Sequence, residues 1–222
     1  MSDSRGVVHG GGGVTRAGRG NYRAFSVTPD GVGFSADHLH ALAREGRIFG
    51  GGDSTLIQTI TSAVTYATTS PTLLLQVPDA TVALPLYLLL TQTGTVGGGE
   101  ITIHIEYDNA DRYTSGGTAE TVLSTRTDAP LAKACTLYSN SGSAIVATDA
   151  YGMGLWHGEF IQDVDPAVAD DFNWHNWEWR PPVPVYLVGP AAFLVNIVAA
   201  TTGATYYWNF FWAEIPESEF TS

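Results

Sequence analysis

The hydrophobicity of this chain repeats every two residues from about Leu56 to the C-terminus, and this period limits the possible folds more than any other feature. In residues 101–108, apolar side chains alternate with threonine, histidine and acidic ones. Successive side chains of a strand point to opposite faces, so the pattern predicts antiparallel strands with one buried face. Helical spacing of apolar residues is convincing only in residues 36–46. We therefore predict an all-β chain with one short helix.

Turn signals rich in glycine, proline and asparagine divide the chain into many short segments. The predicted strands are 56–66, 72–77, 83–91, 101–107, 118–125, 132–138, 144–148, 153–161, 176–180, 183–188, 192–200 and 206–214. Strands at this spacing, without helices between them, predict a β-sandwich or a barrel. Pro85 and Pro184 fall inside predicted strands and indicate edges or bulges. Both faces of the last strand are apolar, so we expect it to be covered on both sides.

The charge of the chain argues against two classes of partner. Only 14% of the residues are charged, and the net charge is −12. Such an acidic protein repels nucleic acid and anionic lipid, so we expect no direct nucleic-acid partner and no membrane partner. The uncharged stretch 181–213 is interrupted by prolines and glycines, which argues against a membrane-spanning helix. This stretch instead predicts two buried strands and a contact with a neighbouring subunit.

The N-terminal part of the chain, residues 1–52, has a different composition. Its first 23 residues contain glycine runs and four arginines, against one acid. Glycine-rich sequence buries little surface, so we predict an extended arm. We assign partner binding in the arm to the arginines, which suit acidic surfaces: Arg5, Arg16, Arg19 and Arg23. A short helix near 36–46 and a glycine hinge at 50–52 are expected to join the arm to a β-domain at 53–222.

Candidate chemical sites are few. The single cysteine, Cys135, excludes an internal disulfide and lies in an ordinary strand pattern, which predicts a packed side chain rather than a nucleophile. Hard oxygen ligands suitable for calcium occur in one acidic cluster, Asp163, Asp165, Asp170 and Asp171. The spacing of this cluster does not match an EF-hand, so we predict no metal and no other cofactor. His157 and Glu159 share a strand face but lack a third zinc ligand.

Three carboxylates in predicted strands leave glycoside hydrolysis open as a weak alternative: Glu106, Glu159 and Glu178. That chemistry requires two carboxylates about 5–10 Å apart in one cleft. A carboxylate that faces solvent from a strand is the default interpretation of each. We therefore predict that the protein is not an enzyme.

Aromatic residues are the richest feature of the sequence. Trp174, Trp177 and Trp179 lie close together, and Trp208 and Trp212 belong to the last predicted strand. Tryptophans stack on sugar rings, anchor subunit interfaces or close the end of a sandwich. These alternatives stay open at this point, and all five tryptophans are candidates for an interface or a ligand site.

Three segments together resemble the jelly-roll decoration, or cement, proteins of tailed-bacteriophage capsids. They are the Gly/Arg-rich arm (1–34), the short helix followed by three glycines (50–52), and the aromatic C-terminal hairpin (193–216). The resemblance implies an antiparallel jelly-roll-like sandwich, a homotrimer, and a location on the capsid surface of the virion. It also implies that the arm reaches over neighbouring major capsid protein subunits. The alternative function is a receptor- or glycan-binding β-module of a phage tail spike or fibre.

Overall fold

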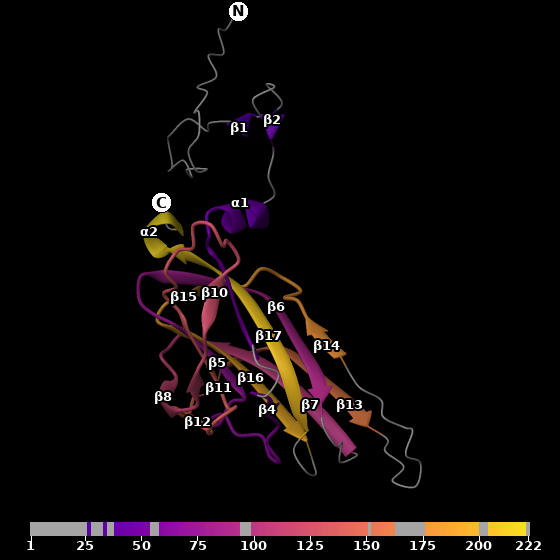
Figure 1. The fold of residues 1–222 in the computed structure, drawn as a ribbon. Coiled ribbons are helices and arrows are strands. Elements are labelled where there is room, and N and C mark those ends of the chain that lie inside the picture. The colour runs from indigo at the N-terminus through magenta and orange to yellow at the C-terminus, as the bar shows by residue number, and fades with distance from the viewer. Residues whose placement is uncertain are drawn as a thin grey trace, which may run out of the picture.

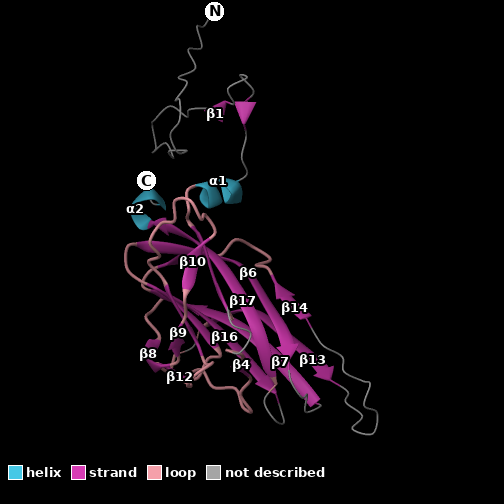
Figure 2. Cartoon of the chain, viewed as in Figure 1, coloured by secondary structure: helices cyan, strands magenta, loops and turns pink. Residues whose placement is uncertain are grey.

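Two antiparallel β-sheets pack face to face and share one hydrophobic core (Figure 1). The structure is a computed structural model, and it describes residues 26–27, 33–34, 38–53, 58–93, 99–150, 152–162, 176–199 and 204–220. The described helices, α1 (His38–Arg44) and α2 (Glu217–Phe220), lie at the same end of the sheets (Figure 2). The prediction of an all-β sandwich with a short helix near residues 36–46 is confirmed.

The first sheet has the strand order β10-β3-β17-β6-β14. These strands are β10 (Val122–Ser124), β3 (Ile48–Gly52), β17 (Thr205–Pro216), β6 (Thr81–Thr93) and β14 (Asn176–Trp179). Two short strands extend it, because β4 (Ile60–Thr61) pairs with β17 and β15 (Leu187–Val188) pairs with β6.

The second sheet has the strand order β13-β7-β16-β5-β11-β9. These strands are β13 (Met153–Gln162), β7 (Gly99–Asp108), β16 (Ala191–Ala199), β5 (Leu73–Val77), β11 (Thr136–Ser139) and β9 (Thr118–Ala119). Two small ribbons complete the described strands: β8 (Tyr113–Gly116) with β12 (Ile145–Ala147), and β1 (Ser26–Val27) with β2 (Gly33–Phe34). Each predicted segment contains at least one described strand, although 56–66 and 183–188 contain only two-residue strands. The prediction missed β1, β2, β3 and β8.

Eight of the longer strands pair in a nested order along the chain. Strand β3 pairs with β17, β5 with β16, β6 with β14, and β7 with β13, always antiparallel. Pairing of β17 with β6 joins two of these pairs into the first sheet, and pairing of β16 with β7 joins the other two into the second. Each of the four pairs thus joins strands that are far apart in the sequence.

The inner faces of the two sheets follow the predicted alternation. Ile101, Ile103 and Ile105 of β7 are buried in the core, and Phe193 of β16 stacks on Phe210 of β17 with ring centroids 5.2 Å apart. Such contacts between the two sheets remove large aromatic surfaces from water, and this burial is the main stabilising term of a sandwich.

Strand β17 is covered on both sides only near its C-terminal end, so the expectation for the whole strand was too broad. Ala213 and Ile215 pack with Leu42 of helix α1 in a second apolar cluster, whereas Asn209 is exposed. The ladder between β17 and β6 has a register shift between Phe211 and Trp212, opposite Pro85 of β6. The bulge predicted at this proline is confirmed, because the ring of proline disturbs a regular ladder.

The three glycines at 50–52 are a strand, and the predicted hinge was wrong. They belong to β3, which pairs with β10 on one side and with β17 on the other. A Cβ at Gly50 would lie 2.6 Å from the ring of Phe211, and one at Gly52 would lie 2.5 Å from Oδ1 of Asn209. On the inner face, a Cβ at Gly51 would lie 2.7 Å from a methyl group of Leu137. Glycine is required here because neighbouring side chains fill the space on both faces.

We predict that Gly52→Ala lowers the free energy of unfolding by about 1–3 kcal/mol, as overpacking commonly does. The added Cβ would lie 2.8 Å from the backbone oxygen of Trp208, which cannot move without disturbing β17. The matched control is Gly154→Ala in β13, where the nearest atom outside the local chain is 3.4 Å away. Urea unfolding of both variants checks the prediction. If Gly52→Ala leaves the free energy of unfolding unchanged, the hinge interpretation would be restored.

Candidate functional site

The outer faces of the two sheets differ in what covers them. On the second sheet, Ile145 and Ala147 of β12 pack on Leu74 and Leu194. Tyr66, from the segment before β5, packs on His104 of the same face. On the first sheet, helix α1 packs at one end, and the remainder carries half-exposed and exposed side chains among the described residues. We take this remainder as the main candidate interaction surface.

The interaction surface consists of cross-strand rows of side chains. One row runs from Leu123 of β10 over Gly50 of β3 to Phe211 of β17 and Tyr87 of β6. The rings of Phe211 and Tyr87 have centroids 6.3 Å apart, and Leu123 is 70% exposed. Antiparallel sheets usually turn polar residues toward water, so this aromatic row makes the face a candidate for contact with another molecule.

A groove of about 300 Å³ follows the glycine strand on this surface. Leu123 and Phe211 line it, together with the backbone of residues 50–52. The ring of Phe211 and the side chain of Asn209 partly cover that backbone. Asn209 adds an exposed amide to the lining. The groove can therefore accept an apolar side chain or a flat ring, with a hydrogen-bonding group beside it.

Arg180 and Glu178 bring charge to the border of the surface at β14, and Asp53 adds an acidic residue to the lining of the groove. The guanidinium of Arg180 lies 5.3 Å from the centre of the Tyr87 ring and 4.0 Å from the carboxylate of Glu178. Burial and the neighbouring Glu178 carboxylate raise the pKa of Tyr87 above its ordinary value. An apolar centre with a charged border is the usual composition of a protein–protein contact.

Three of the five candidate tryptophans lie in the core, so they were wrong as interface or ligand residues. Trp179, Trp208 and Trp212 are at most 3% exposed. They are buried because alternate residues of β14 and β17 point into the sandwich. Trp177 is half-buried and packs on Trp156 at 4.7 Å, which joins the edge strands β14 and β13 of the two sheets. Thus Trp177, together with Trp156, closes one side of the sandwich.

Several predicted sites lie outside the described residues. They are the arm arginines (Arg5, Arg16, Arg19 and Arg23), Trp174, and the acidic cluster (Asp163, Asp165, Asp170 and Asp171). Within the part of the chain that the structure describes, no three His, Cys, Asp or Glu side chains gather closely enough to hold a metal ion. The same part contains no helix long and apolar enough to cross a membrane.

Buried carboxylates, the usual candidates for acid–base chemistry, are engaged in structural hydrogen bonds. Glu214 accepts from the backbone amides of Ala134 and Cys135 and from the Trp212 indole, at 2.6, 3.1 and 2.8 Å. Glu120 accepts a short hydrogen bond from Ser139. These carboxylates tie strand ends and loops to the sheets, because burial would otherwise cost several kcal/mol.

The geometry disfavours the pairing of carboxylates required by a glycosidase. Glu159 lies opposite Thr102, four residues along β7 from Glu106, so the two positions are roughly 13 Å apart at the rise of a strand. This separation exceeds the range of about 5–10 Å for paired catalytic carboxylates. Glu178 lies in the other sheet.

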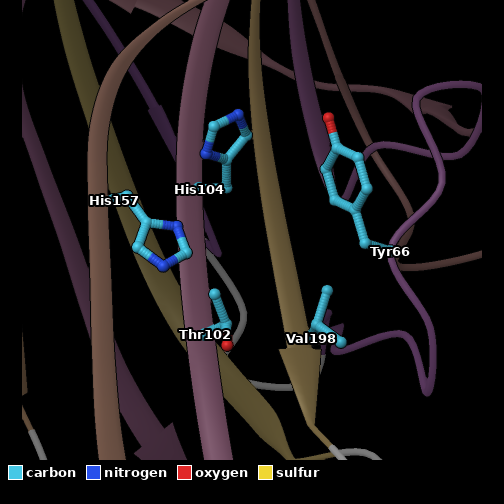
Figure 3. Close-up of a pocket in the computed structure, with 5 residues that line it drawn as sticks. All are labelled: Tyr66, Thr102, His104, His157 and Val198. Carbon is cyan, nitrogen blue, oxygen red and sulfur yellow. The ribbon is translucent and has the colours of Figure 1, made fainter.

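A second pocket, of about 330 Å³, lies on the outer face of the second sheet (Figure 3). His104 of β7 and His157 of β13 stand opposite each other in register, with ring centroids 5.9 Å apart. Tyr66 faces them and contacts the edge of the His104 ring at 5.5 Å. The sequence pattern paired His157 with Glu159, and only the register of these two strands could have revealed His104 opposite it.

Behind the histidines lies Glu106, whose side chain is 3% exposed. The Tyr66 hydroxyl donates to it at 3.3 Å and the Asn196 amide at 3.5 Å, while Nε2 of His104 is 3.6 Å away. Burial and the Glu106 charge raise the pKa of Tyr66, so this phenol stays protonated and remains a donor. Two imidazoles and one phenol therefore line the pocket, and the buried carboxylate of Glu106 lies beside His104 and Tyr66.

Comparison of the chain with protein-family models, with curated proteins and with solved structures gave no match. Functional inference consequently depends on the geometry of the surfaces and on the sequence.

Cys135 is buried, and we predict that it makes stability fall in mildly alkaline solution. Burial and the nearby Glu214 carboxylate raise the pKa of its thiol, so it stays protonated in the fold while the unfolded chain loses this proton above about pH 8.5. Ionisation of the thiol lowers the free energy of the unfolded state only. The free energy of unfolding should therefore fall by about 1 kcal/mol between pH 7.5 and 9.5. Urea unfolding at both values checks this; Cys135→Ala, the control, should remove that part of the loss, and an equal loss in the variant would contradict it.

Proposed function

We propose that this protein is a non-enzymatic structural protein of a virus particle, which decorates and stabilises the outer surface of a phage capsid as a homotrimer. The observation that carries the proposal is the uncovered aromatic face of the first sheet, which suits a subunit contact. Its partners are further copies of the chain and major capsid protein subunits.

The strand order supports a jelly-roll topology, the fold that the resemblance to decoration proteins implies. In a jelly roll, a long antiparallel hairpin of eight strands rolls up so that the first strand pairs with the eighth, the second with the seventh, and so on. The four nested pairs described above follow this scheme. Jelly rolls are common in viral capsid and lectin domains, so the topology favours these classes without deciding between them.

Self-association is supported by the composition of the uncovered face. Leu123, Phe211 and Tyr87 lie in one cross-strand row, in which Gly50 separates Leu123 from Phe211 and contributes its backbone to the groove. A flat face with aromatic residues at its centre, Asp53 in its groove and the charges of Arg180 and Glu178 at its border resembles the core and rim of a subunit interface.

Attachment to a larger particle is supported by the division of charge along the chain. The first 23 residues carry four arginines and one acid, whereas residues 48–222 carry 18 acids and four basic residues. A basic arm and an acidic body have different partners, and two weak contacts on one molecule together give strong attachment. The acidic body also avoids nonspecific binding to nucleic acid.

We predict that Leu123→Glu converts the oligomer into monomers without changing the stability of the fold. The side chain is 70% exposed, so a carboxylate costs little in the monomer but is buried unpaired in the contact. Val146→Glu on the opposite side of the molecule, 45% exposed in the monomer, is the matched control. Sedimentation at several concentrations measures the masses; a monomeric wild type, or an unchanged Leu123→Glu oligomer, would overturn the self-association.

We also predict that trypsin removes the arm from the full-length protein and leaves an oligomeric core. Six of the ten basic residues lie in the first 47, so a free arm offers several cleavage sites. Native mass spectrometry before and after digestion reads both the cleavage and the subunit number. An arm that resists digestion would mean that it packs within its own oligomer, and attachment to a capsid would then have to come from the body.

A glycan-binding module is the second candidate, and the groove on the first sheet favours it. The ring of Phe211 and the exposed amide of Asn209 offer a stacking surface beside a hydrogen-bonding group. Trp179, one of the tryptophans predicted to bind a glycan, is buried and does not support this function. Binding on a glycan array that Asn209→Ala abolishes would favour this candidate over the capsid role.

A further inference from the structure

The histidine pocket of the second sheet has a separate role from the aromatic face. We propose that His104 and His157 bind one divalent transition-metal ion, such as Zn²⁺ or Cu²⁺, which joins strand β13 to β7. The two imidazoles are the protein ligands, and water completes the coordination. This inference is independent of the proposed function.

The spacing of the two rings suits a shared ion. Residues directly opposite each other in an antiparallel pair have Cβ atoms about 4.5–5.5 Å apart, so both side chains reach the same point above the strands. An ion about 2.0–2.1 Å from one nitrogen of each imidazole holds the ring centres roughly 5–6 Å apart. The observed separation is 5.9 Å, with 63° between the ring planes. A small rotation of His157, whose side chain is exposed, is enough to direct both nitrogens to one ion.

The environment of His104 is the one that metal-binding histidines commonly have. Its Nε2 faces the carboxylate of Glu106 at 3.6 Å, which leaves Nδ1 for the ion. A carboxylate behind a ligating histidine fixes the ring and makes the other nitrogen a better ligand. Tyr66 and Asn196 hold this carboxylate in place through hydrogen bonds. The pocket thus contains both the ligands and the groups that orient one of them.

The charge of the pocket also favours a bound cation. Glu106 is buried, and the donors that bind it from Tyr66 and Asn196 are neutral. The nearby Arg112 directs its guanidinium to Asp108 and to the backbone oxygens of Thr68 and Thr148. A cation on His104 offsets the cost of burying the Glu106 charge. Thr102 and Val198 line the rest of the pocket, whose volume of about 330 Å³ leaves room for water ligands.

Calorimetric titration of the full-length protein with ZnCl₂ and with CuSO₄ tests the proposal. We expect one ion per chain, tighter binding of Cu²⁺ than of Zn²⁺, as imidazole ligands prefer, and no binding of Mg²⁺. His157→Gln should lower the affinity for both metals at least tenfold, and Glu106→Gln should lower it roughly 10–100-fold. His40→Gln, on the exposed surface of helix α1, should have no effect.

Thermal unfolding provides a second measurement, which also shows whether a variant that binds no metal is folded. Zn²⁺ should raise the unfolding midpoint of the wild type but not of His157→Gln, because binding to the native state alone stabilises it. His157→Gln is expected to fold, since its side chain is exposed. Equal affinity in the wild type and in His157→Gln would overturn the proposal, and so would loss of binding in His40→Gln. Failure of this site would leave the subunit contact on the first sheet untouched.

Discussion

The close approach of β3 and β17 is the contact on which the first sheet depends. Because Gly50 and Gly52 have no side chains, Phe211 and Asn209 lie across β3 instead of projecting from the sheet. Strand β17 therefore keeps its alternate aromatic residues in the core while its outer face stays flat. One sequence feature, the glycine strand, thus makes the core possible and also shapes the surface that we assign to a partner. A larger residue in β3 would disturb both at once.

The acidity of the body is partly internal, and this changes how its charge should be interpreted. Glu106, Glu120 and Glu214 are all buried, and each accepts hydrogen bonds from a neighbouring segment. Buried carboxylates need specific donors, so they fix the positions of the segments that supply those donors. Their role in the fold is to hold loops against sheets.

Alternation with a period of two predicted which residues of β7 and β17 point inward, because burial of one face imposes this pattern wherever a strand forms. It could not identify β3, since a run of glycines is normally a linker, and here its side-chain space is filled by Phe211 from the other end of the chain. The pairing of His104 with His157 was equally hidden, because it depends on the register between two strands. The tryptophans of β14 were ambiguous because aromatic residues suit a core, an interface or a ligand site equally well.

The edges of the two sheets explain why a metal at the histidine pair would matter to the fold. Strands β9, β10 and β14, which end the sheets in the described part of the chain, contain two, three and four residues, whereas β13 contains ten. A long edge strand presents many unpaired backbone groups and is held from one side only. An ion between His157 and His104 would join β13 to β7 near the middle of its length. The ion would then stabilise the edge of the second sheet. It would leave the aromatic face of the first sheet exposed.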